Sequence, residues 1–284
     1  MARIVGGIAC SHAPSIAHSF DRGLQKEPLW APLYEGYEPA KQWLNALKPD
    51  LMVVVYNDHM NRFFFDAYPS FALGVSASHA QADEGWGKRK LPNLEGHAPF
   101  AQHLAQSLIE DEFDPTICHE MTVDHGILSI LPLLTDARWP APIVPIAANV
   151  IQHPIPTPRR FFRLGLAIRH AIDLYPDDLR VLVVATGGMS HQLHGPKFGF
   201  MNPDWDNEFM DRLEADPLSL TRITHHEYME RGGAESVEIV MWLAMRAAMG
   251  ARVRRIHRHY YAPMLTGYGL VVFESADNQP ATLD

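Results

Sequence analysis

The chain has 284 residues, 20% of them charged, and its formal net charge is −9 at pH 7. A chain of this length can bury a substantial core, and the even spread of apolar residues predicts a single domain over residues 1–284. The acidic balance, without a long Lys/Arg run, argues against a nucleic-acid partner. No apolar stretch is long enough to span a bilayer, so no membrane contact is expected.

Cysteine usage and the N-terminus indicate the compartment. Cys10 and Cys118 are the two cysteines, too few for a disulfide scaffold or a cysteine-based zinc site. We therefore expect two buried thiols and a reducing environment. The first residues enter a strand pattern directly and do not resemble a signal peptide, so the cytoplasm is the expected location.

Short apolar runs alternate with segments of helical periodicity along the chain. The runs that predict strands cover residues 3–9, 51–56, 143–150, 181–186 and 268–273. The segments that predict helices cover residues 38–48, 98–110, 160–174, 206–214 and 234–249. This alternation predicts an α/β fold with a central, largely parallel or mixed sheet and helices on both faces.

Residues 57–97 interrupt this alternation, because they are rich in glycine, proline, aromatic and charged residues. A loop of that length in a compact domain usually serves a functional site. Further along, a proline-rich turn at residues 154–158 predicts that a helix begins at about Arg159, and Gly232-Gly233 precedes the last long helix.

Two histidines follow predicted strands. His12 comes after the strand at residues 3–9, and His59 comes after the strand at residues 51–56. Open α/β sheets place ligands at such strand ends, so each residue is either a metal ligand or an ordinary turn histidine. Asp58 either orients an imidazole through its second nitrogen or closes an Asx turn.

The strand at residues 181–186 leads into a glycine turn that presents Ser190 and His191. A Ser-His pair suggests a hydrolase, but the Gly-x-Ser-x-Gly elbow is absent and adjacent turn residues seldom face each other. A general acid/base role suits His191 better, because its ordinary pKa is near neutral. His125 ends another segment in the same way, and is either a site residue or a buried histidine bonded to backbone.

The last predicted helix carries two candidate carboxylates. Glu235 lies at its start, where a negative charge is favourable near the helix dipole. Glu238 borders the apolar stripe, so it would need a partner such as a metal ion if it were buried. A solvated position on the helix surface is the alternative for Glu238.

Two imidazoles and one carboxylate form the ligand set of non-haem Fe(II) oxygenases, which leaves one face of the metal open. His12, His59 and Glu238 therefore make an iron enzyme the leading interpretation. A zinc-dependent hydrolase on the same sheet is an alternative, since these ligands also suit zinc. A non-catalytic partner subunit that kept the fold is the alternative from a different class.

Several ordered motifs, taken together, are more specific than any one of them. They are Gly-Ile-Ala-Cys-Ser-His-Ala-Pro at 7–14, Tyr-Asn-Asp-His at 56–59, Ala-Asp-Glu-Gly-Trp-Gly at 82–87, Asp-His-Gly at 124–126, Gly-Gly-Met-Ser-His-Gln at 187–192, Glu-Ser-Val-Glu at 235–238 and Met-Trp-Leu at 241–243. With these motifs, nearly the whole chain resembles the class III extradiol dioxygenases, the family of the catalytic beta subunit of protocatechuate 4,5-dioxygenase and of the gallate dioxygenases.

The resemblance implies a role for five residues. The iron ligands of the family fall on His12, His59 and Glu238, and its acid/base histidine falls on His191. A second histidine, which contacts a substrate hydroxyl or the oxygen cosubstrate, falls on His125. The implied reaction is O2-dependent cleavage of an aromatic ring beside a vicinal diol, with Fe(II) as cofactor.

The substrate implied by the resemblance is a carboxylated catechol or pyrogallol of the protocatechuate, gallate or 3-O-methylgallate type. A Ser-Asn pair typical of protocatechuate enzymes is missing before the last strand, where the chain reads Pro-Met-Leu-Thr-Gly at 263–267. This pattern is similar to the gallate branch, which makes Thr266 the candidate for holding the ring carboxylate. Trp86 instead matches the protocatechuate branch, so the two signals disagree. The alternative for Thr266 is an ordinary residue at the start of a strand.

Relatives in the gallate branch often carry a C-terminal lid, whereas protocatechuate enzymes recruit a small helical alpha-type subunit. The sequence ends soon after its final predicted strand, which leaves no room for a lid of domain size. We therefore expect the site to be covered in trans, by a homo-oligomer or by such a subunit.

Overall fold

The computed structural model describes residues 1–135, 137–276 and 279–283. At its centre is an eight-stranded sheet with the strand order β10-β11-β1-β9-β2-β8-β3-β6. Its strands are β1 (Arg3–Cys10), β2 (Leu51–Tyr56), β3 (Phe71–Gly74), β6 (Thr116–Cys118), β8 (Ile143–Ala148), β9 (Arg180–Thr186), β10 (Val253–Tyr261) and β11 (Tyr268–Ser275).

The middle of the sheet is parallel and its flanks include antiparallel pairs. Strands β1, β9, β2 and β8 run parallel to one another, with Cys10 opposite Thr186 at the carboxyl end of the β1–β9 pair. The β10–β11 hairpin joins β1 in antiparallel fashion, and β3 is antiparallel to β8. The sheet is therefore mixed. Because the central strands are parallel, their carboxyl ends meet at one edge, where a site can form.

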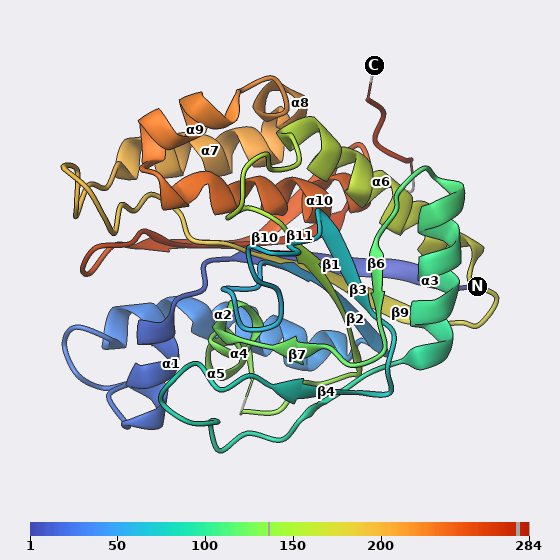
Figure 1. Cartoon of the computed structure of the whole chain (residues 1–284), viewed down its shortest axis with the longest axis horizontal. Coiled ribbons are helices and arrows are strands. Elements are labelled where there is room, and N and C mark those ends of the chain that lie inside the picture. The colour runs from blue at the N-terminus through green and yellow to red at the C-terminus, as the bar shows by residue number, and fades with distance from the viewer. Residues whose placement is uncertain (136, 277–278, 284) are drawn as a thin grey trace.

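Helices cover both faces of the sheet (Figure 1). The helices are α1 (Pro14–Asp21), α2 (Ala31–Leu47), α3 (Ala98–Glu110), α4 (His125–Leu128), α5 (Leu131–Leu134), α6 (Pro158–Leu174), α7 (Pro203–Ala215), α8 (Pro217–Leu220), α9 (His225–Gly232) and α10 (Trp242–Ala248). Helices α6, α7, α9 and α10 lie on one face, and α1, α2, α4 and α5 lie on the other. The predicted α/β class with helices on both faces is confirmed.

Each face of the sheet has its own hydrophobic core. Val53 and Val55 of β2 pack into the core under α6 and α10, whereas Met52 and Val54 pack into the core that contains α2. Side chains alternate between the two faces of a strand, so a central strand must be apolar at every position. The continuous apolar run of β2 meets this requirement.

The segment 57–97, predicted as one long loop, contains regular structure. It holds β3 of the main sheet and two strands of a separate three-stranded sheet with the order β5-β4-β7. The three strands of this second sheet are β4 (Ser78–Gln81), β5 (Leu94–Glu95) and β7 (Thr122–Val123), and β7 lies outside the segment. Runs of two to four residues are too short to show a periodic pattern, so the loop prediction was wrong here.

The helix predicted at residues 234–249 has two parts. A 3-10 helix, η1 (Glu235–Met241), continues into α10. A 3-10 helix repeats every 3.0 residues and an α-helix every 3.6 residues. Over only seven residues, the sequence pattern does not distinguish the two helix types. Strand β10 was not predicted, because its charged and partly exposed residues lack an apolar run.

Both cysteines are buried free thiols, as predicted. Among the described residues, no helix combines the length and the apolar character needed to cross a bilayer. The prediction of one domain over residues 1–284 remains a prediction, since residues 136, 277, 278 and 284 lie outside the described ranges.

Candidate metal centre and active site

Three chain segments leave the carboxyl edge of the sheet and converge. His12 follows β1, His59 follows β2, and the glycine turn at residues 187–191 follows β9, which lies between them. This convergence follows directly from the parallel order β1-β9-β2. It brings residues that are far apart in sequence to one place.

Glu238 lies between the two histidines. Its Oε2 is 3.2 Å from His12 Nε2, and its Oε1 is 3.8 Å from His59 Nε2. The two imidazole rings are 5.0 Å apart between centroids. Within the described residues, the buried His12 Nε2 has no hydrogen-bond partner despite the nearby carboxylate. A buried nitrogen without a hydrogen bond is costly, and a metal ion bound by these three side chains would remove that cost.

The turn after β9 accommodates Glu238 because it contains two glycines. Gly187 has φ of +147°, and a Cβ there would lie 2.6 Å from the carbonyl oxygen of Glu238. Only glycine allows this close approach at a positive φ. The backbone N–H of Gly188 then donates to Glu238 Oε2 at 2.8 Å. The turn therefore fixes one carboxylate oxygen on the side that faces His12.

Each candidate histidine ligand is oriented through its Nδ1 atom. His12 Nδ1 lies 2.9 Å from Thr186 Oγ1, the last residue of β9. His59 Nδ1 lies 3.1 Å from Asp124 Oδ2, and this carboxylate also accepts the backbone N–H of His59 at 2.6 Å. With Nδ1 engaged, Nε2 of both rings faces Glu238, as in many histidine metal sites. His12 Nε2 has no hydrogen-bond partner among the described residues, whereas His59 Nε2 lies 3.0 Å from Asn57 Nδ2, a contact that a bound metal ion would replace.

Asp58 does not orient His59. Its carboxylate accepts the backbone N–H groups of Asn61, Arg62 and Phe63 at 2.9 to 3.1 Å, which closes the turn after β2. The Asx-turn alternative is therefore correct for Asp58, and the orienting role falls to a carboxylate 65 residues away in sequence. The sequence signalled this only through the Asp-His-Gly motif at residues 124–126.

His125 lies against the same cluster. Its ring is 3.8 Å from the ring of His59 between centroids, and its Nδ1 lies 2.5 Å from Glu84 Oε1. The alternative of a histidine bonded to backbone does not hold, and Glu84 was missed by sequence reasoning. His12, His59 and His125 also form a possible three-histidine ligand group, whose nitrogens lie within 4.8 Å of one another. Glu238, whose carboxylate lies against the Nε2 atoms of both His12 and His59, stays the predicted third ligand.

His191 has a defined tautomer. Its Nδ1 is 2.7 Å from the carbonyl oxygen of Met189. A carbonyl can only accept a hydrogen bond, so Nδ1 carries the proton and Nε2 of the neutral ring carries the lone pair. The turn brings this ring near the centre, because a Cβ on Gly188 would touch both His191 Cε1 and Glu238 Oε2, at 2.6 and 3.3 Å. This tautomer, when the ring is neutral, is the one a general base requires, and the acid/base role of His191 stays a prediction.

Ser190 faces away from His191. Its backbone N–H and its hydroxyl donate to the two carboxylate oxygens of Asp206, at 2.8 and 2.6 Å. Asp206 is fully buried and also accepts the hydroxyl of Tyr260 at 2.7 Å. A serine bound in this way is not a nucleophile activated by His191. Asp206 instead anchors the turn that carries His191.

Comparison with known proteins identifies the family. Residues 6–273 match the family described as the catalytic LigB subunit of aromatic ring-opening dioxygenase. The chain belongs to this LigB family. The resemblance to the extradiol dioxygenases inferred from the motifs is thereby confirmed at the level of the family.

Two curated relatives and one solved structure show what this LigB-family chain is similar to. It is 47% identical to gallate dioxygenase of Pseudomonas putida over 198 residues, which are 69% of this chain and 58% of that relative. It is 28% identical, over 82% of its length and 88% of the relative, to a 2,3-dihydroxyphenylpropionate/2,3-dihydroxicinnamic acid 1,2-dioxygenase of Dechloromonas aromatica. An uncharacterized protein from Escherichia coli shares the fold, with a TM-score of 0.54 at 15% identity over 94% of this chain and 99% of that one.

The two other sequence candidates also have clear positions in this LigB-family chain. Thr266 forms a backbone bridge with His191, so it lies beside the acid/base candidate, and its role in holding a carboxylate stays a prediction. Glu235 makes an ion pair with His194 and accepts the N–H of Leu193 at 3.2 Å. Of the two carboxylates in η1, only Glu238 contacts His12 and His59 among the described residues.

The pKa values in the metal-free centre follow from burial and from the carboxylates. Burial lowers the pKa of His12 to about 4, although the carboxylate of Glu238 opposes this shift. Burial would also lower the pKa of His59, but the Asp124 and Glu238 carboxylates raise it to about 10. The pKa of Asp124 is lowered, because the charge of His59 outweighs its burial. Without metal, His59 therefore holds a proton that a metal ion must displace.

We expect the Asp124–His59 pair to make the stability of the metal-free protein depend on pH. The raised pKa of His59 stabilises the fold fully below about pH 6.5, its unfolded value, and this contribution is lost as pH rises towards 10. In the presence of a chelator, the free energy of unfolding should therefore fall by about 2 kcal/mol between pH 6.5 and 10, the value of one charged hydrogen bond. Urea unfolding at several pH values measures this change in the free energy of unfolding.

The Asp124→Asn variant should reduce this alkaline loss, because the carboxylate that raises the pKa of His59 is absent. It should also weaken metal binding by about 10- to 100-fold, since Asp124 orients the ring. Asp66→Asn, at an exposed carboxylate of the loop that carries His59, is the matched control and should change neither property. Equal pH dependence in the parent protein and in Asp124→Asn would contradict the assignment.

We expect Asp206→Asn to loosen the His191 turn. An amide cannot accept all three hydrogen bonds that the carboxylate receives, so the free energy of unfolding should fall by about 1–3 kcal/mol. The value of kcat should fall more than KM changes, because the ring of His191 is misplaced and the substrate contacts are not. Asp204→Asn, an exposed position in the same helix, is the control. Unchanged kcat in Asp206→Asn would argue against the anchoring role.

Proposed function

We propose that this chain is a non-haem Fe(II) extradiol dioxygenase that inserts O2 into the ring of a carboxylated catechol or pyrogallol. The observation that carries the proposal is the position of Glu238, with its two oxygens 3.2 and 3.8 Å from the Nε2 atoms of His12 and His59. Membership of the LigB family supports the reaction class. Two relatives, a gallate dioxygenase and a 2,3-dihydroxyphenylpropionate/2,3-dihydroxicinnamic acid 1,2-dioxygenase, support the substrate class.

His12, His59 and Glu238 would hold the metal ion, and the donor set fits it. Two neutral imidazole nitrogens and one carboxylate oxygen suit Fe(II) and leave room for further ligands. Bound Fe(II) supplies Lewis acidity that lowers the pKa of a catechol hydroxyl and a place where the diol and O2 meet. The same donors suit zinc, so a zinc hydrolase remains the second candidate function. A zinc hydrolase would consume no O2, which distinguishes it from the Fe(II) dioxygenase.

The residues around this centre would handle the proton and the developing charge. Nε2 of His191 takes the proton of one diol hydroxyl and returns it when the ring opens. His125, whose Nδ1 is engaged by Glu84, presents its other ring nitrogen as a hydrogen-bond partner for a substrate hydroxyl or the oxygen cosubstrate. Thr266, joined to His191 through backbone, would hold the ring carboxylate.

A partner that covers the site in trans is part of this proposal. Large apolar side chains are exposed on the loops that carry the site residues, among them Met60, Trp86, Leu193 and Leu265, which are 38 to 66% exposed. Such side chains on one protein commonly mark a surface that another chain covers. A second copy or a small helical subunit would exclude bulk water from the reaction. Light scattering of the purified chain at several concentrations tests the first of these partners.

The proposed reaction is tested by anaerobic reconstitution with Fe(II) and then exposure to air with protocatechuate, gallate or 3-O-methylgallate. We expect O2 uptake equal to the amount of ring opened, with a yellow product from protocatechuate and an open-chain tricarboxylic acid from gallate. Reconstitution with Zn(II) is the control and should give no O2 uptake. Absence of O2 uptake with all three rings would overturn the proposal, and hydrolysis with Zn(II) would support the second candidate.

A further inference from the structure

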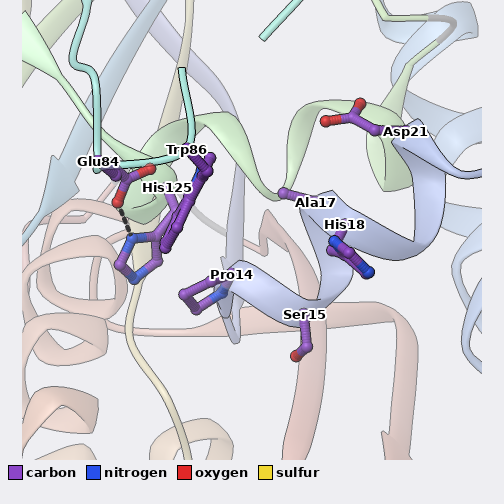
Figure 2. A pocket seen from close by; sticks show the side chains of 8 residues that line it. All are labelled: Pro14, Ser15, Ala17, His18, Asp21, Glu84, Trp86 and His125. Atoms are coloured by element: carbon purple, nitrogen blue, oxygen red, sulfur yellow. Dashed lines mark hydrogen bonds and ion pairs between the residues drawn. The ribbon is translucent and has the colours of Figure 1, made fainter. Parts of the chain in front are cut away.

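A cavity of about 290 Å³ lies between helix α1 and the loop at residues 82–89. Helix α1 contributes Pro14, Ala17 and Asp21 to its walls, and the loop contributes Glu84 and Trp86. Figure 2 shows the α1 side chains on one side of the cavity and the loop side chains, with His125, on the other.

This cavity adjoins the candidate metal centre. His125 forms part of its wall, and the ring of His125 lies 3.8 Å from the ring of His59. Pro14 follows His12 by two residues, so α1 begins directly at the centre. His191 and Thr266 are not among the described residues that line the cavity. A ring bound at the centre would therefore reach the cavity on the side of His125, away from the residue predicted to hold its carboxylate.

The charges around the cavity are already paired. Glu84 contacts His125 Nδ1 at 2.5 Å, and Asp21 accepts two hydrogen bonds from Arg89, at 2.7 and 2.8 Å. Arg89 also donates to the carbonyl oxygen of Leu128 in α4 at 2.6 Å, so this side chain ties the loop to both α1 and α4. The described lining residues include no lysine or arginine. The described lining residues therefore offer a carboxylate no lysine or arginine to pair with, whereas an uncharged group needs no such partner.

We propose that this cavity is a subsite for an uncharged substituent of the aromatic substrate, a hydroxyl or a methoxyl group on the ring edge near His125. The inference rests on the proposed function and names the kind of ring that the site accepts. A volume of about 300 Å³ is the lower end for small-molecule pockets, so the cavity fits part of a ring and its substituent. Ala17 and Trp86 supply apolar surface for a methyl group.

The test compares kcat/KM for 3-O-methylgallate, which carries a methoxyl group, with kcat/KM for protocatechuate, which carries hydrogen at that position. Ala17 is buried and lines the cavity, so Ala17→Leu fills the space that the methoxyl group needs. We expect the ratio of the two kcat/KM values to fall about tenfold, as for one misfitting methyl group. Trp86→Ala removes the opposite wall and should lower the same ratio through lost contact.

Phe65→Ala is the matched control, because Phe65 is an exposed aromatic side chain outside the cavity, 56% exposed against 66% for Trp86. Its ratio should equal that of the parent enzyme. Circular dichroism shows whether the Ala17→Leu variant folds. If that variant does not fold, the kcat/KM ratio of Trp86→Ala decides the test.

Two results overturn the subsite and leave the proposed function standing. One is an unchanged ratio in the deciding variant, and the other is a parent enzyme that cleaves protocatechuate but not 3-O-methylgallate. Failure of the Fe(II)-loaded parent to cleave any ring overturns both the subsite and the proposed function.

Discussion

Replacing Glu238 with glutamine is expected to abolish ring cleavage and to weaken Fe(II) binding by at least about 100-fold, the upper end for loss of residues that only orient a ligand. The side chain keeps its shape, and Gly188 N–H still finds an oxygen to donate to. The negative charge between His12 and His59 is lost, however. Anaerobic Fe(II) titration and O2 uptake measure the two effects separately.

Glu235→Gln is a matched control for this prediction. It makes the same chemical change in the same 3-10 helix, but Glu235 pairs with His194 on the outside of the site. Its Fe(II) affinity and kcat should equal those of the parent enzyme. Full Fe(II) affinity in Glu238→Gln would assign the third ligand elsewhere, and the three-histidine group with His125 would become the leading ligand set.

Replacing His191 with alanine is expected to lower kcat by about 10²- to 10⁴-fold, the usual value of a positioned acid/base group. Fe(II) content should stay unchanged, because the side chain is oriented by the carbonyl of Met189 and is not one of the three proposed ligands. Metal analysis of the reconstituted variant and steady-state O2 uptake check both parts. Added imidazole should restore part of the lost activity, which a purely structural role would not allow.

His194→Ala is the control for His191→Ala, since His194 lies three residues further along the same loop with a side chain 72% exposed. It should keep the kcat of the parent enzyme. Unchanged turnover in His191→Ala would refute the acid/base assignment while leaving the metal ligands untouched. Loss of Fe(II) together with activity would instead move His191 into the metal centre.

The sequence predicted those parts of the fold whose pattern is local and long. The run at residues 51–56 corresponds to β2 and the periodic segment at residues 98–110 corresponds to α3, both with matching ends. A strand buried on both faces is apolar throughout, and an amphipathic helix repeats its apolar residues over several turns. Strand β10 shows neither pattern, because it is the edge of the sheet and half of it faces solvent.

The candidate ligands were found because strand ends and a resemblance pointed to them, but their orienting partners were not. Asp124 contacts His59 across 65 residues, Glu84 contacts His125 across 41, and Asp206 contacts Ser190 across 16. Such pairs depend on how loops pack over the sheet, and a single sequence carries no periodic signal for them. The sequence left Asp58 open between an orienting role and an Asx turn for the same reason, since proximity in sequence was the only guide.

The turn between β10 and β11 meets the acid/base segment through main-chain atoms. Met189 N donates to Gly267 O at 3.3 Å, and Gly267 N donates to Ser190 O at 3.0 Å. Met264 and Leu265 project from the same turn as exposed side chains. Main-chain bonds do not depend on side-chain identity, so the exposed Met264 and Leu265 can be replaced while these bonds, and the histidines that follow β1 and β2, stay in place. New ring preferences can therefore arise, or be engineered, without rebuilding the histidine–carboxylate cluster.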